Sequence, residues 1–323
     1  MDSTNEFAAG MYDALKRLRS EAAQAASVVP QNAEFPIVAA RERATKTYEY
    51  FNRQPPNLAS VENVTAQGAY GQRMIRMYRG QLSQEPQPVL LYAHGGGWIV
   101  GNLDLEDWGL RYMAQQSNAC IISLDYCLAP EYQYPKPVED VAALAQWVRD
   151  NAAIYNLDKD RIAIAGASAG ANLALASSMM LRDLGEDWLA CVLSFYGVFD
   201  TSMGSESHRT YAVDRYSAGA PDLNFFLSLY LADESERTLE LVHLVGANLS
   251  GLPPVHIHAA ELDVLRDDSL LLANRLRSAN VPHSCTVHAG AVHGFTVLAQ
   301  EVAVGREALK MGVRQIEQEW GRP

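Results

Sequence analysis

Short apolar runs alternate with amphipathic helical stretches through most of this 323-residue chain. The runs are far shorter than a membrane span and suit parallel strands buried on both faces of a sheet. Helical spacing lies between them, notably over 137–150, 169–182 and 267–279. These repeated units predict an α/β fold, a mostly parallel central sheet flanked by helices. The expected strands are Pro88–Ala93, Ala119–Asp125, Arg161–Ala165, Cys191–Phe195, Val255–Ala259 and Ser284–His288.

Two segments depart from this alternation. Residues 1–50 carry an apolar stripe at helical spacing, and residues 201–248 join a polar loop to an apolar helix with Asp222 as its expected N-cap. We expect both to form a helical cap over a main domain of residues 51–200 and 249–323. The second helix could belong to the core or roof a pocket, through Phe225, Phe226, Leu229 and Tyr230.

The charge of the chain restricts its partners. A net charge of −12 argues against nucleic acid, because phosphates are bound by clustered Lys and Arg, and against anchoring to anionic membranes. The N-terminus lacks the basic start and apolar stretch of a secretory signal. We therefore expect a cytoplasmic protein. The oligomeric state is left open, with a homodimer as one arrangement to test.

A GASAG motif at residues 166–170 directly follows an expected strand and precedes an apolar, small-residue helix. This is the context of a nucleophile elbow, a turn so tight that the residues beside the serine must be small. The start of the following helix also favours developing negative charge. We predict Ser168 to be a catalytic nucleophile.

A second motif, HGGGW at residues 94–98, directly follows the expected strand Pro88–Ala93. Attack on a carbonyl creates an oxyanion, and backbone N–H groups approach it closely only where side chains are absent. The glycine loop, together with the N–H of Ala169 beside the serine, can supply these donors. The two motifs predict a serine hydrolase.

A serine hydroxyl needs a base, and the base needs an orienting acid, in the chain order Ser, acid, His. His293 follows the last expected strand and is our predicted base, in preference to His288 within that strand and His283 before it. Asp263, after the strand Val255–Ala259, is the predicted acid. Glu261 and Asp267 are the alternatives to this acid.

Other chemistry has little support in the sequence. His256 and His258 share one face of a strand, but no third ligand stands at a convincing spacing, so we expect packing and no metal site. There is no P-loop and no GxGxxG after a strand, and nothing implies a cofactor. The four cysteines lack CxxC pairing and are expected to be buried, reduced thiols.

The chain resembles the bacterial hormone-sensitive-lipase-like carboxylesterases, and within that family its enterobacterial acetyl esterases. The resemblance covers nearly the whole sequence. It rests on HGGGW at 94–98, GNLD at 101–104, DYCLAPE at 125–131, Ser168 with its flanks, LAS at 175–177, the run 261–268 and HGF at 293–295.

The resemblance implies an α/β-hydrolase fold under a helical cap, and hydrolysis of small esters of acetyl and other short acyl groups without a cofactor. It places the oxyanion hole at Gly96, Gly97 and Ala169. Three positions depart from the family pattern. Ala167 stands where an Asp is usual beside the nucleophile, Cys127 replaces an Arg or Thr, and Val264 replaces a Pro.

Two other functions compete with an esterase. An amidase or arylformamidase would use the same triad, because leaving-group preference depends on the pocket. A small-ligand receptor, like the plant gibberellin receptors that resemble this family, would have lost the catalytic histidine. The presence of both Ser168 and His293 favours the enzyme.

Overall fold

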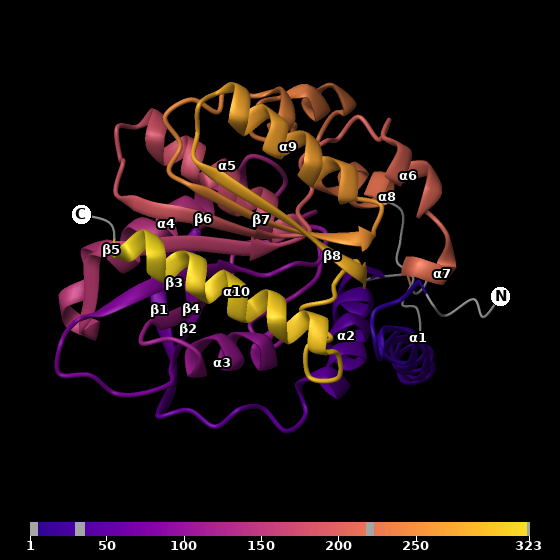
Figure 1. The fold of residues 1–323 in the computed structure, drawn as a ribbon, viewed down its shortest axis with the longest axis horizontal. Coiled ribbons are helices and arrows are strands. Elements are labelled where there is room, and N and C mark those ends of the chain that lie inside the picture. Colours follow the sequence, from indigo (N-terminus) through magenta and orange to yellow (C-terminus); the bar gives the residue numbers. More distant parts are fainter. Residues whose placement is uncertain (1–5, 30–35, 218–222, 322–323) are drawn as a thin grey trace.

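A single eight-stranded sheet crosses the centre of the protein (Figure 1). The structure is a computed structural model and describes residues 6–29, 36–217 and 223–321. The spatial order of the strands is β1-β2-β4-β3-β5-β6-β7-β8. Their bounds are β1 Ser60–Gly68, β2 Gly71–Arg79, β3 Gln87–Ala93, β4 Cys120–Leu124, β5 Leu157–Ala167, β6 Leu189–Phe195, β7 Val255–Leu262 and β8 His283–Val292.

The sheet is mostly parallel, as expected. Strands β3, β5, β6, β7 and β8 run parallel to their neighbours, and β4 runs parallel to β3. Strands β1 and β2 form an antiparallel hairpin, and β2 pairs antiparallel with β4. The six expected strands all exist, and most are longer than the apolar runs that revealed them. The hairpin was not expected, because β1 is largely exposed and polar and gives no buried apolar run.

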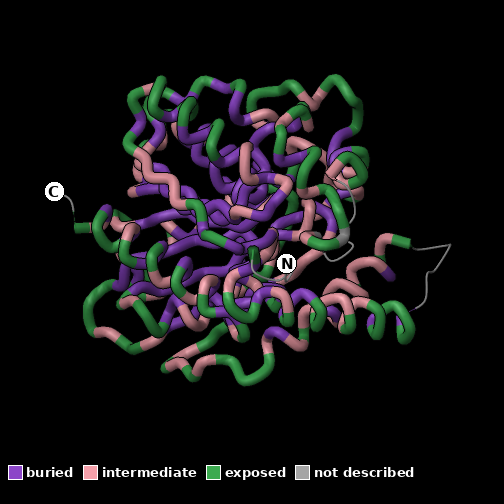
Figure 2. The backbone as a smooth tube through the Cα atoms, turned by 45° about the vertical axis from the view of Figure 1, so that its right-hand side comes forward, coloured by how far each residue is buried: buried purple, intermediate pink, exposed green. Residues whose placement is uncertain are grey.

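Helices cover both faces of the sheet. Helices α3 (Asp107–Gln115) and α10 (Ala303–Trp320) pack on one face, and α4 (Lys136–Asp150), α5 (Ala169–Asp183) and α9 (Arg266–Ser278) pack on the other. Two separate apolar clusters result, one on each face. Strand β3 shows how alternation feeds both, because Val89 and Leu91 belong to one cluster while Leu90 and Tyr92 belong to the other. The buried backbone accordingly follows the central strands (Figure 2).

The remaining helices gather where the central strands end (Figure 1). They are α1 (Met11–Val28) and α2 (Pro36–Glu49) from the N-terminal segment, and α6 (Glu206–Thr210), α7 (Asp214–Ser217) and α8 (Leu223–Tyr230) between β6 and β7. Short 3₁₀ turns complete the chain at Tyr50–Asn52, Ala152–Tyr155, Glu234–Thr238 and Leu244–Gly246. The expected N-cap Asp222 lies outside the described residues.

The N-terminal segment and the segment between β6 and β7 contact each other although about two hundred positions separate them. Phe7 packs against the ring of Tyr216 with ring centroids 5.9 Å apart, and Glu6 forms an ion pair with Arg215. The amide of Ala8 donates to the carbonyl of Gly290 in β8 at 2.9 Å. The N-terminal segment and the segment between β6 and β7 are therefore joined to each other beside the carboxyl end of β8.

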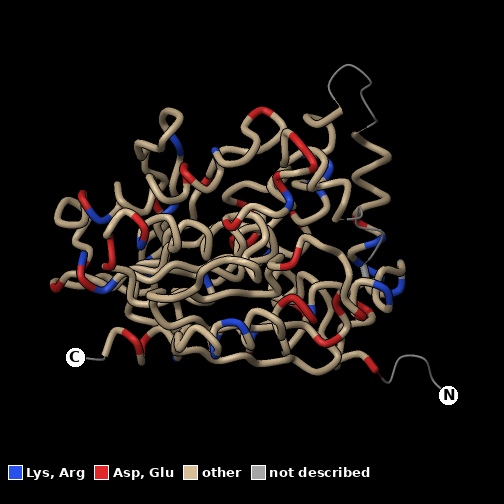
Figure 3. Tube along the Cα trace, turned by 90° about the horizontal axis from the view of Figure 1, so that it is seen from above, with Lys and Arg blue, Asp and Glu red and all other residues tan. Residues whose placement is uncertain are grey.

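Charged residues of both signs are interspersed along the chain (Figure 3). Within the described ranges, no helix has the length and apolarity needed to cross a membrane. All four cysteines lie within the described residues, and none of them forms a disulfide. Cys120, Cys127 and Cys191 are buried, but Cys285 is only half-buried because it lies on the edge strand β8.

Candidate active site

Ser168 occupies a sharp turn between β5 and α5. Its backbone has φ 54° and ψ −121°, a conformation that residues with a side chain rarely adopt and that costs free energy on folding. The turn closes because its glycines allow backbone contact. A Cβ atom on Gly166 would lie 2.3 Å from the backbone of Gly170, and one on Gly170 would lie 2.1 Å from the carbonyl oxygen of Ala93. The strained turn leaves the Ser168 hydroxyl partly accessible.

His293 and Asp263 meet this serine from two neighbouring strands. The Oγ atom of Ser168 lies 3.0 Å from Nε2 of His293, and Nδ1 of His293 lies 2.9 Å from Oδ2 of Asp263. Asp263 follows β7 and His293 follows β8, so the parallel sheet brings both to the edge where β5 ends. The Asp263 side chain is fully buried, whereas that of His293 remains 33% exposed. The imidazole of His293 is therefore open to solvent on one side, whereas the carboxylate of Asp263 is shielded from water.

The two alternative acids make other contacts. Glu261 accepts a hydrogen bond from the amide of Gly290 at 2.7 Å. Asp267 forms an ion pair with Arg266 at 2.9 Å and accepts from the amide of Ser207 at 2.8 Å. Only Asp263, among these three predicted candidates, contacts His293.

The rival histidines lie elsewhere. His288 is in β8 and bonds Nδ1 of His258 through its Nε2 at 2.9 Å. His283 begins β8, at the end of the strand opposite His293. His256 contacts Ser284 at 2.8 Å and Glu319 at 3.1 Å. No group of three or more metal-ligating side chains occurs in the part of the chain that the structure describes.

The glycine loop lies beside the serine. A Cβ atom on Gly95 would be 3.5 Å from Cβ of Ser168. Gly96 and Gly97 have φ of 114° and 60°, and both are partly accessible. Among the described residues, no acceptor is recorded for either amide. Ala169 is the first residue of α5, where the amide has no acceptor within the helix. Within the described residues, the amides of Gly96, Gly97 and Ala169 thus have no hydrogen-bond acceptor.

Helix α8 covers this loop. A Cβ atom added to Gly97 would lie only 2.2 Å from Cδ1 of Phe226, so the ring of Phe226 packs directly on this glycine. The ring of Tyr230 stacks on Trp98 with centroids 4.5 Å apart and planes 5° apart. Sequence alone left open whether this helix joins the core or roofs a pocket, and the structure shows that it contributes to the core. Leu227 and Tyr230 are buried in the core, while Phe226 faces the glycine loop.

The electrostatic environment of His293 raises the pKa of its imidazole. Burial lowers its pKa, but the charge of Asp263, the hydrogen bond to Asp263 and the charge of Glu106 outweigh burial and raise the pKa above its ordinary value. His94 behaves in the opposite way. Its ring is buried and stacks on Tyr126, and burial lowers its pKa to about 4 despite its hydrogen bond to the carbonyl of Gly95.

Two contacts at the site could not be read from the sequence. Tyr196, after β6, meets the ring of His293 edge-on with centroids 5.0 Å apart. Arg41, in α2, donates to the carbonyls of Ile99 and Ala129 and pairs with Glu131 at 2.6 Å. Neither residue belongs to a motif, so only the folded chain identifies them.

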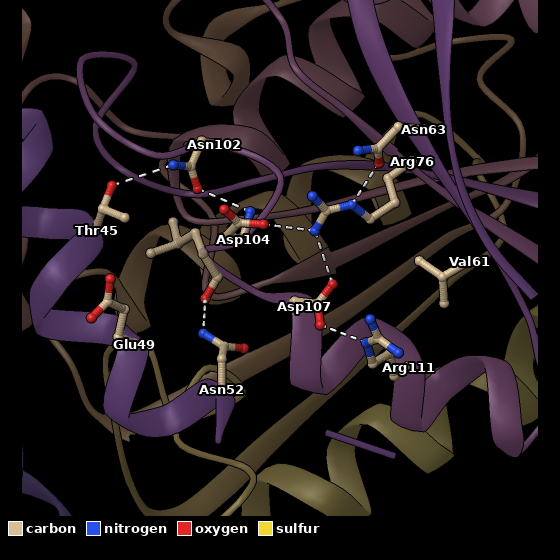
Figure 4. Close-up of a pocket in the computed structure, with 11 residues that line it drawn as sticks. Thr45, Glu49, Asn52, Val61, Asn63, Arg76, Asn102, Asp104, Asp107 and Arg111 are labelled. Carbon is tan, nitrogen blue, oxygen red and sulfur yellow. Dashed lines mark hydrogen bonds and ion pairs between the residues drawn. The ribbon is translucent and has the colours of Figure 1, made fainter. Parts of the chain in front are cut away.

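A polar cleft of about 600 Å³ opens between α2, the β1–β2 hairpin and the segment that follows the glycine loop (Figure 4). Its side chains largely bond one another. Arg76 pairs with Asp104 and Asp107, and Arg111 pairs with Asp107. Ser168, His293 and Asp263 do not line this cleft. Its lining comprises Thr45, Glu49, Asn52, Val61, Asn63, Arg76, Asn102, Asp104, Leu105, Asp107 and Arg111.

Comparison with known proteins identifies the family to which this fold belongs. Residues 90–297 match the α/β-hydrolase fold family. The acetyl esterase of Salmonella schwarzengrund is 31% identical over 271 residues, which is 82% of this chain and 82% of the relative. Carboxylesterase NlhH of Mycobacterium tuberculosis is 36% identical over 252 residues, 75% of this chain and 77% of the relative.

Solved structures agree with these relatives. A hyperthermophilic esterase from Pyrobaculum calidifontis superposes with a TM-score of 0.86 at 30% identity, over 93% of this chain and 97% of the other. EstE1, a thermostable carboxylesterase cloned from a metagenomic library, gives a TM-score of 0.85 at 30% identity, over 89% and 98%. The chain belongs to the α/β-hydrolase family, in its hormone-sensitive-lipase-like carboxylesterase branch. The expected fold and the family resemblance are confirmed.

Proposed function

We propose that the protein is a carboxylesterase that hydrolyses esters of acetyl and other short acyl groups. The observation that carries this proposal is the continuous pair of contacts from Ser168 through His293 to Asp263, at 3.0 and 2.9 Å. A hydroxyl, an imidazole and a buried carboxylate in this order form the arrangement that activates serine as a nucleophile.

The reaction has two half-reactions. His293 accepts the Ser168 proton while Oγ attacks the ester carbonyl, and the amides of Gly96, Gly97 and Ala169 hold the oxyanion. Collapse of the tetrahedral intermediate breaks the bond to the alcohol, which His293 protonates as it leaves. His293 then activates a water molecule, which hydrolyses the acyl-enzyme and releases the carboxylic acid.

Asp263 holds the imidazole in the required tautomer. Its Oδ2 accepts from Nδ1, which leaves Nε2 free to accept the serine proton. Its other oxygen accepts from the amide of Leu265 at 3.0 Å, which fixes the carboxylate. The hydrogen bond and the negative charge both favour the imidazolium that forms during each half-reaction.

The short-acyl preference is supported by the packing of helix α8 on the glycine loop. Phe226 packs directly on Gly97, so a bulky chain next to the oxyanion would meet an aromatic ring. Two relatives named above are an acetyl esterase and a carboxylesterase. We assign residues 1–50 and 201–248 to the cap and residues 51–200 and 249–323 to the catalytic domain, because the helices of the former gather at the edge that carries Ser168.

The test is a rate series on p-nitrophenyl esters of increasing acyl length, with wild type and Ser168→Ala. We expect the highest kcat/KM at two to about four acyl carbons, and a loss of about 10⁶-fold in kcat for Ser168→Ala. Ser178→Ala, another buried serine of α5 whose hydroxyl has no recorded partner, is the matched control and should retain activity. Ester hydrolysis that survives in Ser168→Ala would contradict the proposal, and a maximum at long acyl chains would contradict the short-acyl preference.

Two further assays separate the competing functions. A fluorophosphonate should label wild type stoichiometrically and leave Ser168→Ala unlabelled, whereas a receptor without an activated serine would not react. A matched pair of aryl acetate and aryl acetamide then compares leaving groups. We expect the ester to be cleaved faster, and faster amide cleavage would instead support an amidase.

A further inference from the structure

A carboxylate outside every motif lies directly behind the glycine loop. Glu106 is only 5% exposed. Its Oε1 accepts a hydrogen bond from the amide of Gly95 at 2.9 Å, and its Oε2 accepts from the hydroxyl of Tyr92. A buried carboxylate ordinarily needs a cation. Among the described residues, the cationic group whose charge lowers the pKa of the Glu106 carboxyl is the imidazolium of His293.

The position of Glu106 is fixed by the segment around it. Glu106 is the N-cap residue of α3, and its carbonyl accepts from the amide of Leu110 at 3.0 Å. The next residue, Asp107, accepts from Tyr78 at 2.9 Å and pairs with Arg76 and Arg111, at 3.0 and 2.5 Å (Figure 4). Asp107 therefore anchors one side of the segment, while Glu106 on the same segment bonds the glycine loop.

The groups around Glu106 set the pKa of its carboxyl, and His293 is one of them. Burial raises the pKa of Glu106 to about 7, against the hydrogen bonds from Tyr92 and Gly95 and the charge of His293, which lower it. Its other titratable neighbours are tyrosines, whose pKa values are raised chiefly by burial. They come from α2, β3 and the loops after β4 and β6, and are Tyr48, Tyr92, Tyr126 and Tyr196.

We propose that Glu106 is a positioning residue of the active site, which holds the glycine loop through the Gly95 amide and acts by its negative charge on the imidazole of His293. The inference rests on the function proposed above, because it assigns a role within that reaction. Asp263 acts on His293 through a hydrogen bond at Nδ1, whereas Glu106 acts without a hydrogen bond to the ring. Both charges favour the imidazolium that forms when Ser168 gives up its proton.

The two contributions of Glu106 can be separated by the substitution Glu106→Gln. The glutamine oxygen can still accept from the Gly95 amide, so the loop keeps its hydrogen bond while the charge disappears. Without that charge the imidazolium is less stable and His293 loses its proton more readily. A residue with a purely structural role would change the stability or the maximal rate but would not move the titration of His293.

The experiment compares pH profiles of kcat/KM for an aryl acetate between pH 5 and 9. Because the raised pKa of Glu106 leaves its carboxyl partly protonated across the acidic limb, we expect Glu106→Gln to lower the midpoint of that limb by about 0.3 to 0.5 pH unit. The plateau kcat should fall by up to about tenfold, with little change in KM. Tyr92→Phe keeps the carboxylate but removes one of its donors, which raises the pKa of Glu106. Its limb should move in the same direction by a smaller amount.

Glu319→Gln is the matched control. Glu319 is a buried carboxylate, 8% exposed, that bonds a histidine, but His256 lies at the opposite end of the strands from the triad. The acidic limb of Glu319→Gln should coincide with that of wild type. The inference is overturned if the acidic limb of Glu106→Gln has the same midpoint as that of wild type. If Glu106→Gln does not fold, a wild-type midpoint in Tyr92→Phe overturns it instead. The variant Ser168→Ala in the same assay tests the proposed function separately. It removes the proposed nucleophile and leaves Glu106 unchanged, so activity that survives in it would contradict the proposed function and not the role of Glu106.

Discussion

Nε2 of His293 lies 3.0 Å from Oγ of Ser168 although 125 positions separate the two residues in the chain. The parallel sheet explains this proximity. Strands β5 and β8 end at the same edge, and β7, which precedes Asp263, lies beside β8 in the strand order. The sheet therefore brings together, at one edge, three segments that lie far apart in the chain.

The assignment of the acid can be tested against its two alternatives. Asp263→Asn should lower kcat by about 10⁴-fold, because an amide cannot hold the productive tautomer or stabilise the imidazolium. Glu261→Gln and Asp267→Asn serve as matched controls, since neither residue contacts His293. Steady-state rates on an aryl acetate, with thermal unfolding to check folding, give the answer. If either control lost as much activity as Asp263→Asn, the acid would be misassigned.

The pH dependence of the reaction follows from the ionisation of His293. The neutral imidazole is the reactive form, so kcat/KM is maximal above the pKa of His293 and falls as the pH drops through it. The environment raises this pKa from the ordinary value of 6.5, mainly through Asp263 against the opposing effect of burial. The acidic limb should therefore have a midpoint above 6.5. A profile of kcat/KM from pH 5 to 9 measures it, and a midpoint clearly below 6.5 would contradict the electrostatic account.

Sequence patterns predicted the central strands because burial on both faces leaves continuous apolar runs such as PVLLYA in β3. They also singled out Ser168, His293 and Asp263, which the folded chain brings into contact, because a nucleophile elbow and the chain order Ser, acid, His place such residues directly after strand ends. The catalytic roles of these residues stay predictions. The hairpin β1–β2 gave no such signal. Charged and polar side chains interrupt its apolar residues, as do Arg73 and Arg76, which pair with carboxylates from distant segments.

The surroundings of the triad could not be predicted for a similar reason. Glu106 carries no motif, and its importance arises from contacts with Gly95 and Tyr92 that depend on the folded loop. The contact of Phe226 with Gly97 joins two segments more than a hundred residues apart. A hydrophobic pattern indicates that such a ring is buried or covered, but it does not identify the surface that the ring covers.

The packing of Phe226 on Gly97 predicts a rescue between two substitutions. Gly97→Ala places a methyl group where the ring lies, and it also strains a residue with φ of 60°. We expect kcat to fall by about 10²-fold, because displacement of the loop misdirects an oxyanion donor. Phe226→Ala alone should retain activity and accept longer acyl chains.

A double-mutant cycle isolates the contact between these two positions. In Gly97→Ala/Phe226→Ala the added methyl group occupies the space that the ring has left, so the double variant should recover part of the rate lost in Gly97→Ala. The comparison uses kcat on the acetate and the butyrate ester for all four proteins. Strictly additive losses would mean that the ring and the loop act independently, contrary to the geometry.

Buried histidines away from the triad predict instability in acid. Burial lowers the pKa of His288 to about 4, and burial together with the charge of His288 lowers that of His258 to about 3. These values lie below the ordinary value of 6.5, so the unfolded chain binds protons that the folded chain does not. Stability is therefore present above pH 6.5 and is lost as the pH falls below it, at up to about 1.4 kcal/mol per pH unit for each such proton.

The variant His288→Gln tests this account, because a glutamine can still bond Nδ1 of His258 but does not titrate. The free energy of unfolding, measured by urea denaturation at several pH values between 7.5 and 5, should fall less steeply with acid in this variant than in wild type. His283→Gln, at the partly exposed start of the same strand, is the control and should keep the wild-type slope. An unchanged slope in His288→Gln would show that protonation of this ring does not drive acid unfolding, and the loss of stability would then have to come from other groups such as His94.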